Sequence, residues 1–405
     1  MNSFTLYTPT RIHFGADQLD AFAQATARLG HHAFVVTGGG TIQRLGILDQ
    51  VSGSLTKAGL KLTHFPGIEP NPEAATINRA TAALRVAQAD IVVALGGGSV
   101  IDASKAIAAL AHSGENDIWP FVAGEPRAFQ LKGALPIAAI TTTAATASEV
   151  TPYAVISNRA AKGKSILAAE FLKPLTAWLN PVFTTGLSAR TTQDGAADIL
   201  SHVFENYLLG GSDSAIADRY SEGIISTVIE TLPRLLASPS DLVARGNLQW
   251  TATLALNDYQ QAGRKPSQFV LHLIEHALSA FRPELAHGRG LATLYPAYFR
   301  WLLSEGRAVD RLAQLGERIF GLTGTEATRA QGFITRFEQW LQDNQLYQSL
   351  EQLGFAETEY PAIAEYAVRS GGDGRQLDAA GPLPAEKIVA LFRATKRQVV
   401  GSKAA

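Results

Sequence analysis

The sequence predicts two domains: an α/β nucleotide-binding domain over residues 1–183 and an all-helical domain over residues 184–405. In the first half, short apolar runs, glycines and helical patterns alternate, which is typical of a doubly wound, mostly parallel sheet. In the second half, long helix-compatible segments dominate and strand-like runs almost vanish. The boundary near Asn180-Pro181 follows from this change of period, not from a linker composition.

The clearest strand of the first half is Ile91–Leu95, because β-branched residues run there without alternation, as in a parallel sheet covered on both faces. Helical spacing of apolar residues predicts helices over residues 19–29, 74–86 and 100–111. The remaining expected strands cover residues 33–37, 60–65 and 136–141.

Two helices are expected in the second half around pairs of polar residues one turn apart. The first contains Asp198 and His202; its apolar residues Ile199, Val203, Phe204 and Tyr207 recur at helical spacing, and Gly210-Gly211 ends it. The second contains His272 and His276 and ends at Pro283. Further helices are expected over residues 215–236, 241–259, 305–320, 325–342 and 384–399.

Composition excludes several classes of protein. Of 405 residues, 46% are hydrophobic and 18% are charged, which is the profile of a soluble enzyme. The formal net charge of -1 gives no reason to expect a nucleic acid or an anionic membrane as partner. Without cysteine, the chain has no disulfide, thiolate zinc site or thiol nucleophile. Apolar runs are too short to span a bilayer, and the N-terminus lacks the pattern of a secretory signal, so we expect a cytoplasmic location.

Histidines in the second half are spaced as metal ligands. Asp198 and His202 are four residues apart, as are His272 and His276, and His287 follows on an expected loop. On helices, each pair lies on one face, so facing helices would gather a carboxylate and several imidazoles around one divalent metal. A lone histidine on an apolar face is more often a core residue. Four of the nine histidines falling in these segments favours the metal site.

The glycines after the clearest strand are typical of phosphate binding. Gly96, Gly97 and Gly98, followed by Ser99, let a backbone approach a phosphate at a helix N-terminus. Asp102 is expected in the first turn of that helix, either binding a ligand or favouring the positive helix end. A tight turn without a ligand is the alternative, since the spacing is not the dinucleotide fingerprint.

Two other stretches have features of a nucleotide site. Thr141–Ser148 follows the next strand and is rich in hydroxyls, which also suits a plain strand end. Gly38, Gly39 and Gly40 follow the first expected strand, with Thr41 and Arg44 nearby and no acid to hold the ribose hydroxyls of NAD. This pattern favours NADP, unless Arg44 is only a solvated helix charge.

Taken in order, these motifs resemble the iron-containing, metal-dependent group III alcohol dehydrogenases, over essentially the whole chain. The resemblance is strongest to the branch of NADPH-dependent aldehyde reductases and butanol dehydrogenases. It is carried by the following segments: Phe14-Gly15, Ile68–Pro72, Gly96–Asp102 with Lys105, Thr142–Thr151, Asp198 with His202, His272 with His276, and His287-Gly288.

The resemblance implies a dehydroquinate synthase-like architecture with the active site between the two domains, and a homodimer. It implies that the metal ligands are Asp198, His202, His272 and His287, with His276 in the catalytic pocket. The residues expected to contact the cofactor are Gly38, Gly39, Gly40, Thr41, Arg44, Asn71, Gly97, Gly98, Ser99, Asp102, Thr142, Thr143, Thr146 and Lys164.

The sequence departs from the family pattern at three places. Ala145 and Ala147 stand where the family usually has glycines. Asn180-Pro181 replaces Asp-Pro, and one residue is added between His272 and His287, around Arg282–Glu284.

The expected activity is reversible hydride transfer between NADP(H), with NAD(H) as the alternative, and small aldehydes or primary alcohols. One carboxylate and three imidazoles suit Zn(II) or Fe(II). His276 is the candidate for relaying the proton. The alternatives are a metal-dependent lyase or synthase that uses the nucleotide transiently, and a non-catalytic protein that binds metal and nucleotide.

Overall fold

The computed structural model describes residues 1–161 and 163–396. The chain forms two compact units. One comprises Phe4–Ile199 with Glu230–Ala262, and the other comprises Met1–Ser3, Leu200–Ile229 and the chain from Gly263 onward. The predicted domain boundary at residue 183 stays a prediction. The observed units differ from it in grouping residues 184–199 and 230–262 with the sheet.

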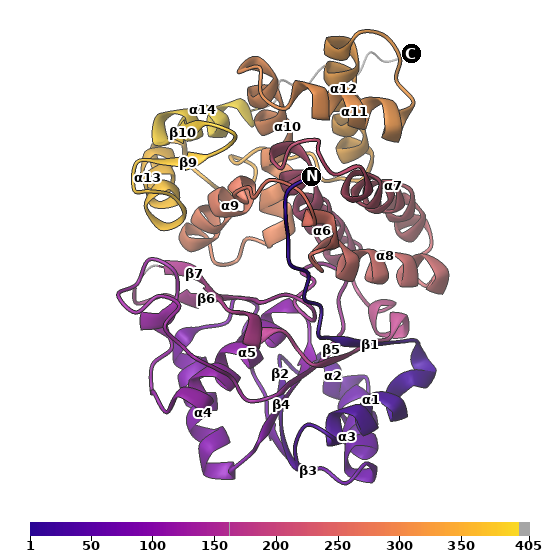
Figure 1. The fold of residues 1–405 in the computed structure, drawn as a ribbon, viewed down its shortest axis with the longest axis vertical. Coiled ribbons are helices and arrows are strands. Elements are labelled where there is room, and N and C mark those ends of the chain that lie inside the picture. Colours follow the sequence, from indigo (N-terminus) through magenta and orange to yellow (C-terminus); the bar gives the residue numbers. More distant parts are fainter. Residues whose placement is uncertain (162, 397–405) are drawn as a thin grey trace. The chain divides into compact units, whose positions relative to one another are not determined.

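A parallel sheet of six strands forms the centre of the first unit (Figure 1). Its order is β1-β8-β5-β4-β2-β3. The strands are β1 (Arg11–Phe14), β2 (His32–Thr37), β3 (Lys61–Phe65), β4 (Ile91–Gly96), β5 (Ile137–Thr141) and β8 (Thr176–Leu179). Because β2, β4 and β5 are parallel neighbours, the segments that follow them all start at the carboxyl ends of the strands, on the same side of the sheet.

Helices cover both faces of this sheet, as Figure 1 shows. On β4, Val92 and Ala94 face one apolar core, whereas Val93 and Leu95 face another. The first core includes residues of α4 (Ala74–Ala87) and α5 (Gly98–Ser113), and the second includes residues of α1 (Leu19–Ala27), α2 (Thr41–Arg44) and α3 (Ile47–Lys57). Helices on both faces of a parallel sheet confirm the doubly wound α/β prediction. A strand that is buried on both faces has no polar side, which is why the apolar run of β4 does not alternate.

Four strands of this unit were not predicted from the sequence. β1 and β8 have four residues each, too few to show a period. β6 (Tyr153–Asn158) and β7 (Gly163–Ala168) form a separate antiparallel pair that includes Lys164 and Ser165. The helix α8 (Leu242–Ala255) also belongs to this unit, with Gln249 donating a hydrogen bond to the Thr141 carbonyl at the end of β5.

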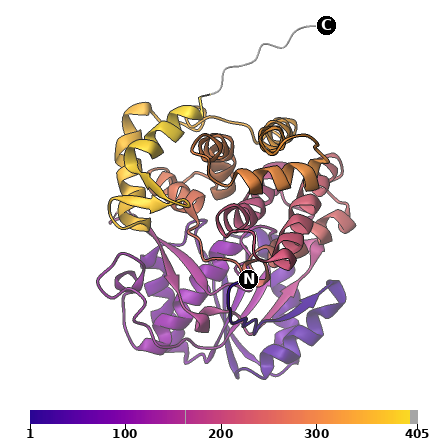
Figure 2. The ribbon, with the colours of Figure 1, turned by 45° about the horizontal axis from the view of Figure 1, so that its top comes forward.

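Helices make up most of the second unit, and Figure 2 shows those near the C-terminus in orange and yellow. The helix α6 (Ala189–Leu209) begins in the first unit and ends in the second, whereas α7 (Ala215–Ala237) begins in the second and ends in the first. The other helices are α9 (Val270–Phe281), α10 (His287–Ser304), α11 (Val309–Phe320), α12 (Glu326–Asp343), α13 (Tyr360–Gly371) and α14 (Ala385–Ala394). A short antiparallel pair of strands, β9 (Gln376–Asp378) and β10 (Pro382–Pro384), is the one strand feature that the all-helical expectation lacked within the described part of this unit.

The helix expected over residues 305–320 begins later, at Val309. Gly306 and Ala308 have φ values of 67° and 52°, so the backbone turns left-handed between α10 and α11. The helix expected over residues 384–399 is observed as α14, and its last three residues lie outside the described residues.

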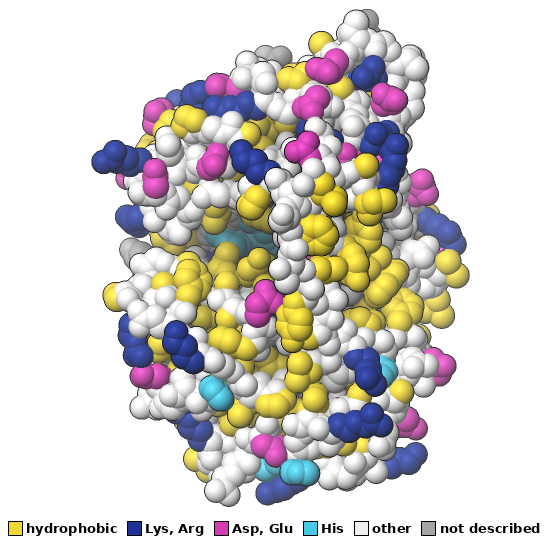
Figure 3. All heavy atoms as spheres, in the orientation of Figure 1, with side chains coloured by type: hydrophobic (Ala, Val, Ile, Leu, Met, Phe, Trp, Pro, Cys, Tyr) yellow, Lys and Arg dark blue, Asp and Glu magenta, His cyan; other side chains and the backbone are white. Residues whose placement is uncertain are grey.

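None of the helices in the described ranges is long and apolar enough to cross a membrane. Figure 3 shows basic and acidic side chains interspersed over the visible face, in keeping with the net charge of -1. A surface of mixed sign gives no electrostatic footprint for a polyanion on that face.

Candidate metal and nucleotide sites

The candidate metal ligands lie on three helices, α6, α9 and α10, and aromatic rings pack two of these, α6 and α10, against each other. On α6, Phe204 makes edge contacts with Tyr295 and Phe299 of α10 and with Phe333 and Phe337 of α12. These ring centroids are 5.2–6.0 Å apart, the range in which edge-to-face pairs are favourable. The apolar period of α6 therefore fixes the face that carries its polar residues.

Asp198, His202 and His272 form a buried group. Their candidate ligand atoms all lie within 4.8 Å of one another. Asp198 and His202 are one turn apart on α6, and the ring of His202 stacks on that of His272 from α9 at 4.9 Å between centroids. The structure therefore brings together three of the four residues expected to bind metal in a single group.

His287 lies beside this group. The sequence placed it on a loop, but it is the first residue of α10, after the N-cap residue Ala286. The loop prediction was wrong because Pro296 and the glycines 288 and 290 obscure the helical pattern of α10. The ring of His287 is 5.1 Å from that of His272 and 5.3 Å from that of His276, between centroids. His287 forms a second group of potential ligands with Glu275 and His276.

Two buried glutamates that the sequence analysis did not single out contact the histidines. Glu205 Oε1 lies 2.5 Å from His272 Nδ1, and a carboxylate oxygen of Glu275 contacts His287 Nδ1. Neither glutamate has a spacing signature in the sequence, since the histidine that each one contacts lies on another helix.

The donor set suits a divalent ion. A carboxylate and imidazoles are ligands that Zn(II) and Fe(II) both accept. Buried ionisable groups within ligand distance of each other are costly unless they are paired or bind an ion. The residues present therefore fit the Zn(II) or Fe(II) ion that is expected from the sequence.

The glycines at the start of α5 allow a close approach by the hydroxyl-rich loop. A Cβ atom added at Gly97 would lie 3.1 Å from Thr143 Oγ1, and one added at Gly98 would lie 2.6 Å from Thr146 Oγ1. The amide of Thr142 also donates to the Gly96 carbonyl at 3.0 Å. The structure thus gathers these glycines and threonines at the carboxyl ends of β4 and β5, where doubly wound sheets bind ligands.

Asp102 has a different environment from the one expected. It lies just beyond the first turn of α5, because that helix begins at Gly98. Its Oδ1 accepts a hydrogen bond from the Ser148 hydroxyl at 2.5 Å and its Oδ2 accepts one from the Val155 amide at 2.9 Å. Burial raises the pKa of this carboxyl. Asp102 therefore ties the hydroxyl-rich loop and β6 to α5, a role that the sequence did not indicate.

A buried lysine stands beside this carboxylate. Lys105 Nζ donates to the carbonyls of Thr151 and Tyr153 at 2.9 and 2.7 Å. Burial lowers the pKa of Lys105 to about 8, although the nearby Asp102 and Glu149 carboxylates act in the opposite direction. Burial also raises the pKa of Glu149, which accepts a hydrogen bond from Thr253 of α8. The segment that contains Glu149 and Thr151 is therefore held by Lys105 of α5 and by Thr253 of α8.

The other residues expected near the cofactor are spread over three segments of the same unit. Ser99 donates from its hydroxyl to the Pro70 carbonyl, next to Asn71. Lys164 is buried on β7, and its charge partly opposes the rise that burial causes in the pKa of Asp102. Gly38, Gly39 and Gly40 follow β2, and Arg44 folds back to donate to Thr41 Oγ1 at 2.8 Å.

Comparisons with known proteins show the family of the chain. The model of a family described as iron-containing alcohol dehydrogenase matches residues 9–181, and that of the C-terminal part of the Fe-containing alcohol dehydrogenase family matches residues 192–395. The NADPH-dependent aldehyde reductase YqhD of Escherichia coli is 34% identical, over 90% of this chain and 92% of its own. Probable NADH-dependent butanol dehydrogenase 1 of Bacillus subtilis is 37% identical, over 79% of this chain and 81% of its own.

Solved structures show the same fold. The structure of NADH-dependent butanol dehydrogenase A from Thermotoga maritima superposes with a TM-score of 0.92 at 30% identity, covering 98% of this chain and 99% of that one. The two family models and the identity to these relatives lead to the same conclusion. The chain belongs to the iron-containing alcohol dehydrogenase family, in the branch of YqhD and the butanol dehydrogenases.

Proposed function

We propose that this chain reduces small aldehydes with NADPH and, in reverse, oxidises primary alcohols with NADP. As a member of its family it is an NAD(P)-dependent oxidoreductase that uses a divalent metal. The observation that carries the proposal is the buried group of Asp198, His202 and His272 with the ring of His287 beside it.

Asp198, His202, His272 and His287 would hold one Zn(II) or Fe(II) ion. When bound, such an ion acts as a Lewis acid that polarises a carbonyl or lowers the pKa of an alcohol. The four residues lie on three helices, so the site forms only when these helices have packed together. His276 is proposed to lie in the catalytic pocket without binding the ion.

His276 is the proposed carrier of the proton that the substrate oxygen gains or loses. Its ring is buried and lies 5.3 Å from that of His287, between centroids. An imidazole changes protonation near neutral pH, which suits general acid-base catalysis. The nicotinamide, when bound, carries the hydride. The protein orients it against the substrate and supplies the electrostatic environment.

The cofactor would lie along the glycines and threonines that follow β2, β4 and β5. Gly97 and Gly98 would admit the pyrophosphate, and Thr142, Thr143 and Thr146 would donate hydrogen bonds to it. For NADP over NAD, the support is the absence of an acid among residues 38–41 and the presence of Arg44. A cytoplasmic location stays a prediction, which fractionation of cells would test.

The test is a panel of short aldehydes with NADPH, read by nicotinamide absorbance, on wild-type and Asp198→Ala protein. We expect turnover by the wild type, and loss of bound metal and turnover together in the variant. His112→Asn, which changes an exposed histidine outside the group, is the matched control. Full activity of demonstrably metal-free protein would exclude the Lewis-acid role. Turnover without net absorbance change would favour the lyase alternative.

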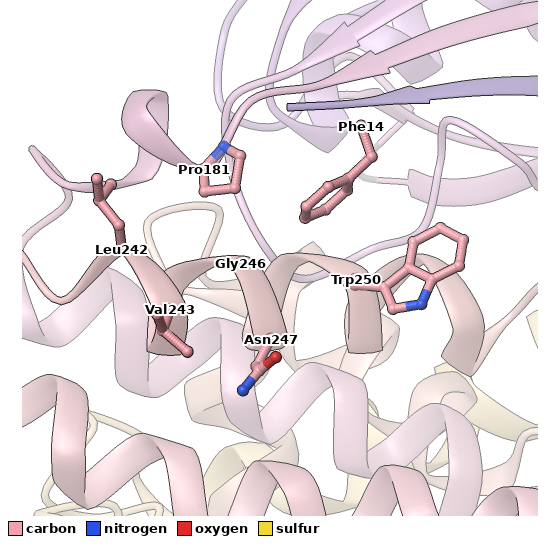
Figure 4. A pocket seen from close by; sticks show the side chains of 7 residues that line it. All are labelled: Phe14, Pro181, Leu242, Val243, Gly246, Asn247 and Trp250. Atoms are coloured by element: carbon pink, nitrogen blue, oxygen red, sulfur yellow. The ribbon is translucent and has the colours of Figure 1, made fainter. Parts of the chain in front are cut away.

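We also infer a homodimer. Among the strands that the structure describes, β1 pairs with β8 alone and so leaves a sheet edge open. Next to it is a hollow of about 490 Å³ in which Phe14 of β1 faces Trp250 of α8 (Figure 4). Its other lining residues are Pro181, Leu242, Val243, Gly246 and Asn247.

Exposed apolar side chains around this hollow support the inference. Leu242, Val243 and Trp250 are 50%, 64% and 40% exposed, and such patches mark contacts between chains. Light scattering should give the mass of two chains for the wild type and of one for Val243→Lys combined with Trp250→Lys. A monomeric wild type would refute the homodimer.

A further inference from the structure

We propose that Glu205 and Glu275 are positioning residues that fix the tautomer and orientation of His272 and His287 for metal binding. The inference rests on the proposed metal site. It assigns a role to two carboxylates that are not themselves proposed to be ligands.

Glu205 makes three hydrogen-bond contacts, two of which join α6 to α9. Its Oε1 lies 2.5 Å from His272 Nδ1 and accepts a hydrogen bond from the Ser201 hydroxyl at 3.0 Å. Its Oε2 accepts from the Leu271 amide at 2.6 Å, immediately before the histidine. The carboxylate thus holds both the backbone and the ring of one candidate ligand, and its side chain has no exposed surface.

Glu275 does the same for His287 across α9 and α10. One carboxylate oxygen contacts His287 Nδ1, and the other accepts a hydrogen bond from the Ser279 hydroxyl one turn along α9. Gly290 leaves room for it, because a Cβ atom added there would lie 2.7 Å from Glu275 Cγ. The side chain of Glu275 is also fully buried.

The chemistry of imidazole gives these contacts a consequence. An ionised carboxylate accepts hydrogen bonds and donates none, so the proton of a neutral His272 or His287 lies on Nδ1. The lone pair then lies on Nε2, which becomes the ligating atom. A carboxylate on the opposite nitrogen also makes the imidazole a more basic ligand.

Two independent copies of this arrangement argue against a chance core contact. Each glutamate is on a different helix, each contacts Nδ1 rather than Nε2, and each has a serine four residues away that donates to it. A buried carboxylate is costly to place in a core. A pair of apolar residues would pack the same helices without that cost.

The first test uses the metal-free wild-type protein with ¹⁵N-labelled histidine. We expect the proton of His272 and His287 on Nδ1, assigned with His272→Gln and His287→Gln samples. Protons on Nε2 in the two rings would overturn the proposal without any change at the glutamates.

The second test measures the dissociation constant for Zn(II), by competition with a chelator, in Glu205→Gln and Glu275→Gln protein. We expect each variant to bind Zn(II) about 10–100-fold more weakly than the wild type. Glu222→Gln is the matched control, because Glu222 is also buried among helices but pairs with Tyr207 and Arg318. Its Zn(II) affinity should match the wild type even if its thermal stability falls.

The outcomes separate this inference from the proposed function. Tight Zn(II) binding by the wild type and equally tight binding by both glutamine variants would overturn the positioning role alone. Wild-type protein that binds no Zn(II) would instead refute the metal site. If Glu205→Gln does not fold, Ser201→Ala, which removes one hydrogen bond to the same carboxylate, should give a smaller loss in the same direction. An unchanged affinity there would count against the proposal.

Discussion

Gly98 and Thr146 are packed so closely that a Cβ atom added at Gly98 would lie 2.5 Å from Thr146 Cγ2. Gly98 is the first residue of α5, and Thr146 belongs to the loop that follows β5. The contact therefore joins the two segments that are proposed to hold the pyrophosphate. The lack of a side chain at Gly98 brings the threonine hydroxyl to the helix N-terminus.

We expect Gly98→Ala to lower the free energy of unfolding by about 1–3 kcal/mol, because the added methyl group overpacks the loop. The dissociation constant for NADPH, measured by fluorescence titration, should rise as well. Gly53→Ala is the control: it lies on α3 with open space around it, so alanine there should stabilise the protein by about 0.5–1 kcal/mol. Unchanged NADPH binding in Gly98→Ala would show that Thr146 need not approach α5.

Ala147 has a φ of 52° and is buried in the same loop. An L-residue in this region costs about 1–2 kcal/mol, a strain that glycine would not have. Ala147→Gly removes that strain but raises the entropy of the unfolded chain, an opposing effect of about 0.5–1 kcal/mol. We expect a net gain of about 1 kcal/mol or less in urea unfolding. Ala145→Gly, at a residue without positive φ, should destabilise the protein instead. A loss of stability in Ala147→Gly would show that the left-handed conformation is not strained.

The buried Lys105 predicts a specific dependence of stability on pH. Its pKa is about 8 in the folded protein, against an ordinary value of 10.5 for lysine. Between these values the unfolded chain binds more protons, so stability rises with pH. The gain over this window is about 3 kcal/mol, and below pH 8 the full penalty of the buried charge remains.

Lys105→Met should abolish this rise, since it keeps the buried volume and removes the titrating group. The check is the free energy of unfolding at about pH 7.5, 8.5 and 9.5, taken as the difference between variant and wild type. Lys57→Met, at an exposed lysine, should leave the pH profile unchanged. Parallel profiles for Lys105→Met and wild type would mean that Lys105 is not buried in its charged form.

The sequence predicts the parts of the fold that have a local pattern, either an apolar period or an unbroken apolar run. The strand at Ile91–Gly96 is buried on both faces, so its apolar run is unbroken and easily recognised. β8 could not be recognised, because Thr176–Leu179 is short and its neighbours in the sheet are distant in sequence. Pairing between distant strands leaves no local signal in such a segment.

The candidate sites show the same limit. A spacing of four placed Asp198 with His202 on one helix face, and the structure agrees. The contacts of Glu205 with His272 and of Asp102 with Val155 join different elements. Residue spacing describes one element at a time, so these partners could be found only in three dimensions.

Gly39 offers a direct test of the preference for NADP. Its φ is not positive, and a Cβ atom added there would have no atom within 4 Å, so a side chain can be introduced without strain. A carboxylate at this position would accept hydrogen bonds from the ribose hydroxyls of NADH and repel the 2′-phosphate of NADPH. We expect Gly39→Asp to shift the ratio of kcat/KM for NADPH over NADH by about tenfold or more toward NADH, because like charges in contact cost about 1.4 kcal/mol or more.

Two variants complete this test. Gly39→Ala restricts the backbone in the same way without adding charge, so its cofactor preference should equal that of the wild type. Arg44→Ala should raise the KM for NADPH more than that for NADH, whereas Arg28→Ala, an exposed arginine at the end of α1, should change neither. Equal effects of Arg44→Ala on both cofactors would remove Arg44 from the phosphate site. A Gly39→Asp protein that still prefers NADPH would place the adenosine ribose away from the turn after β2.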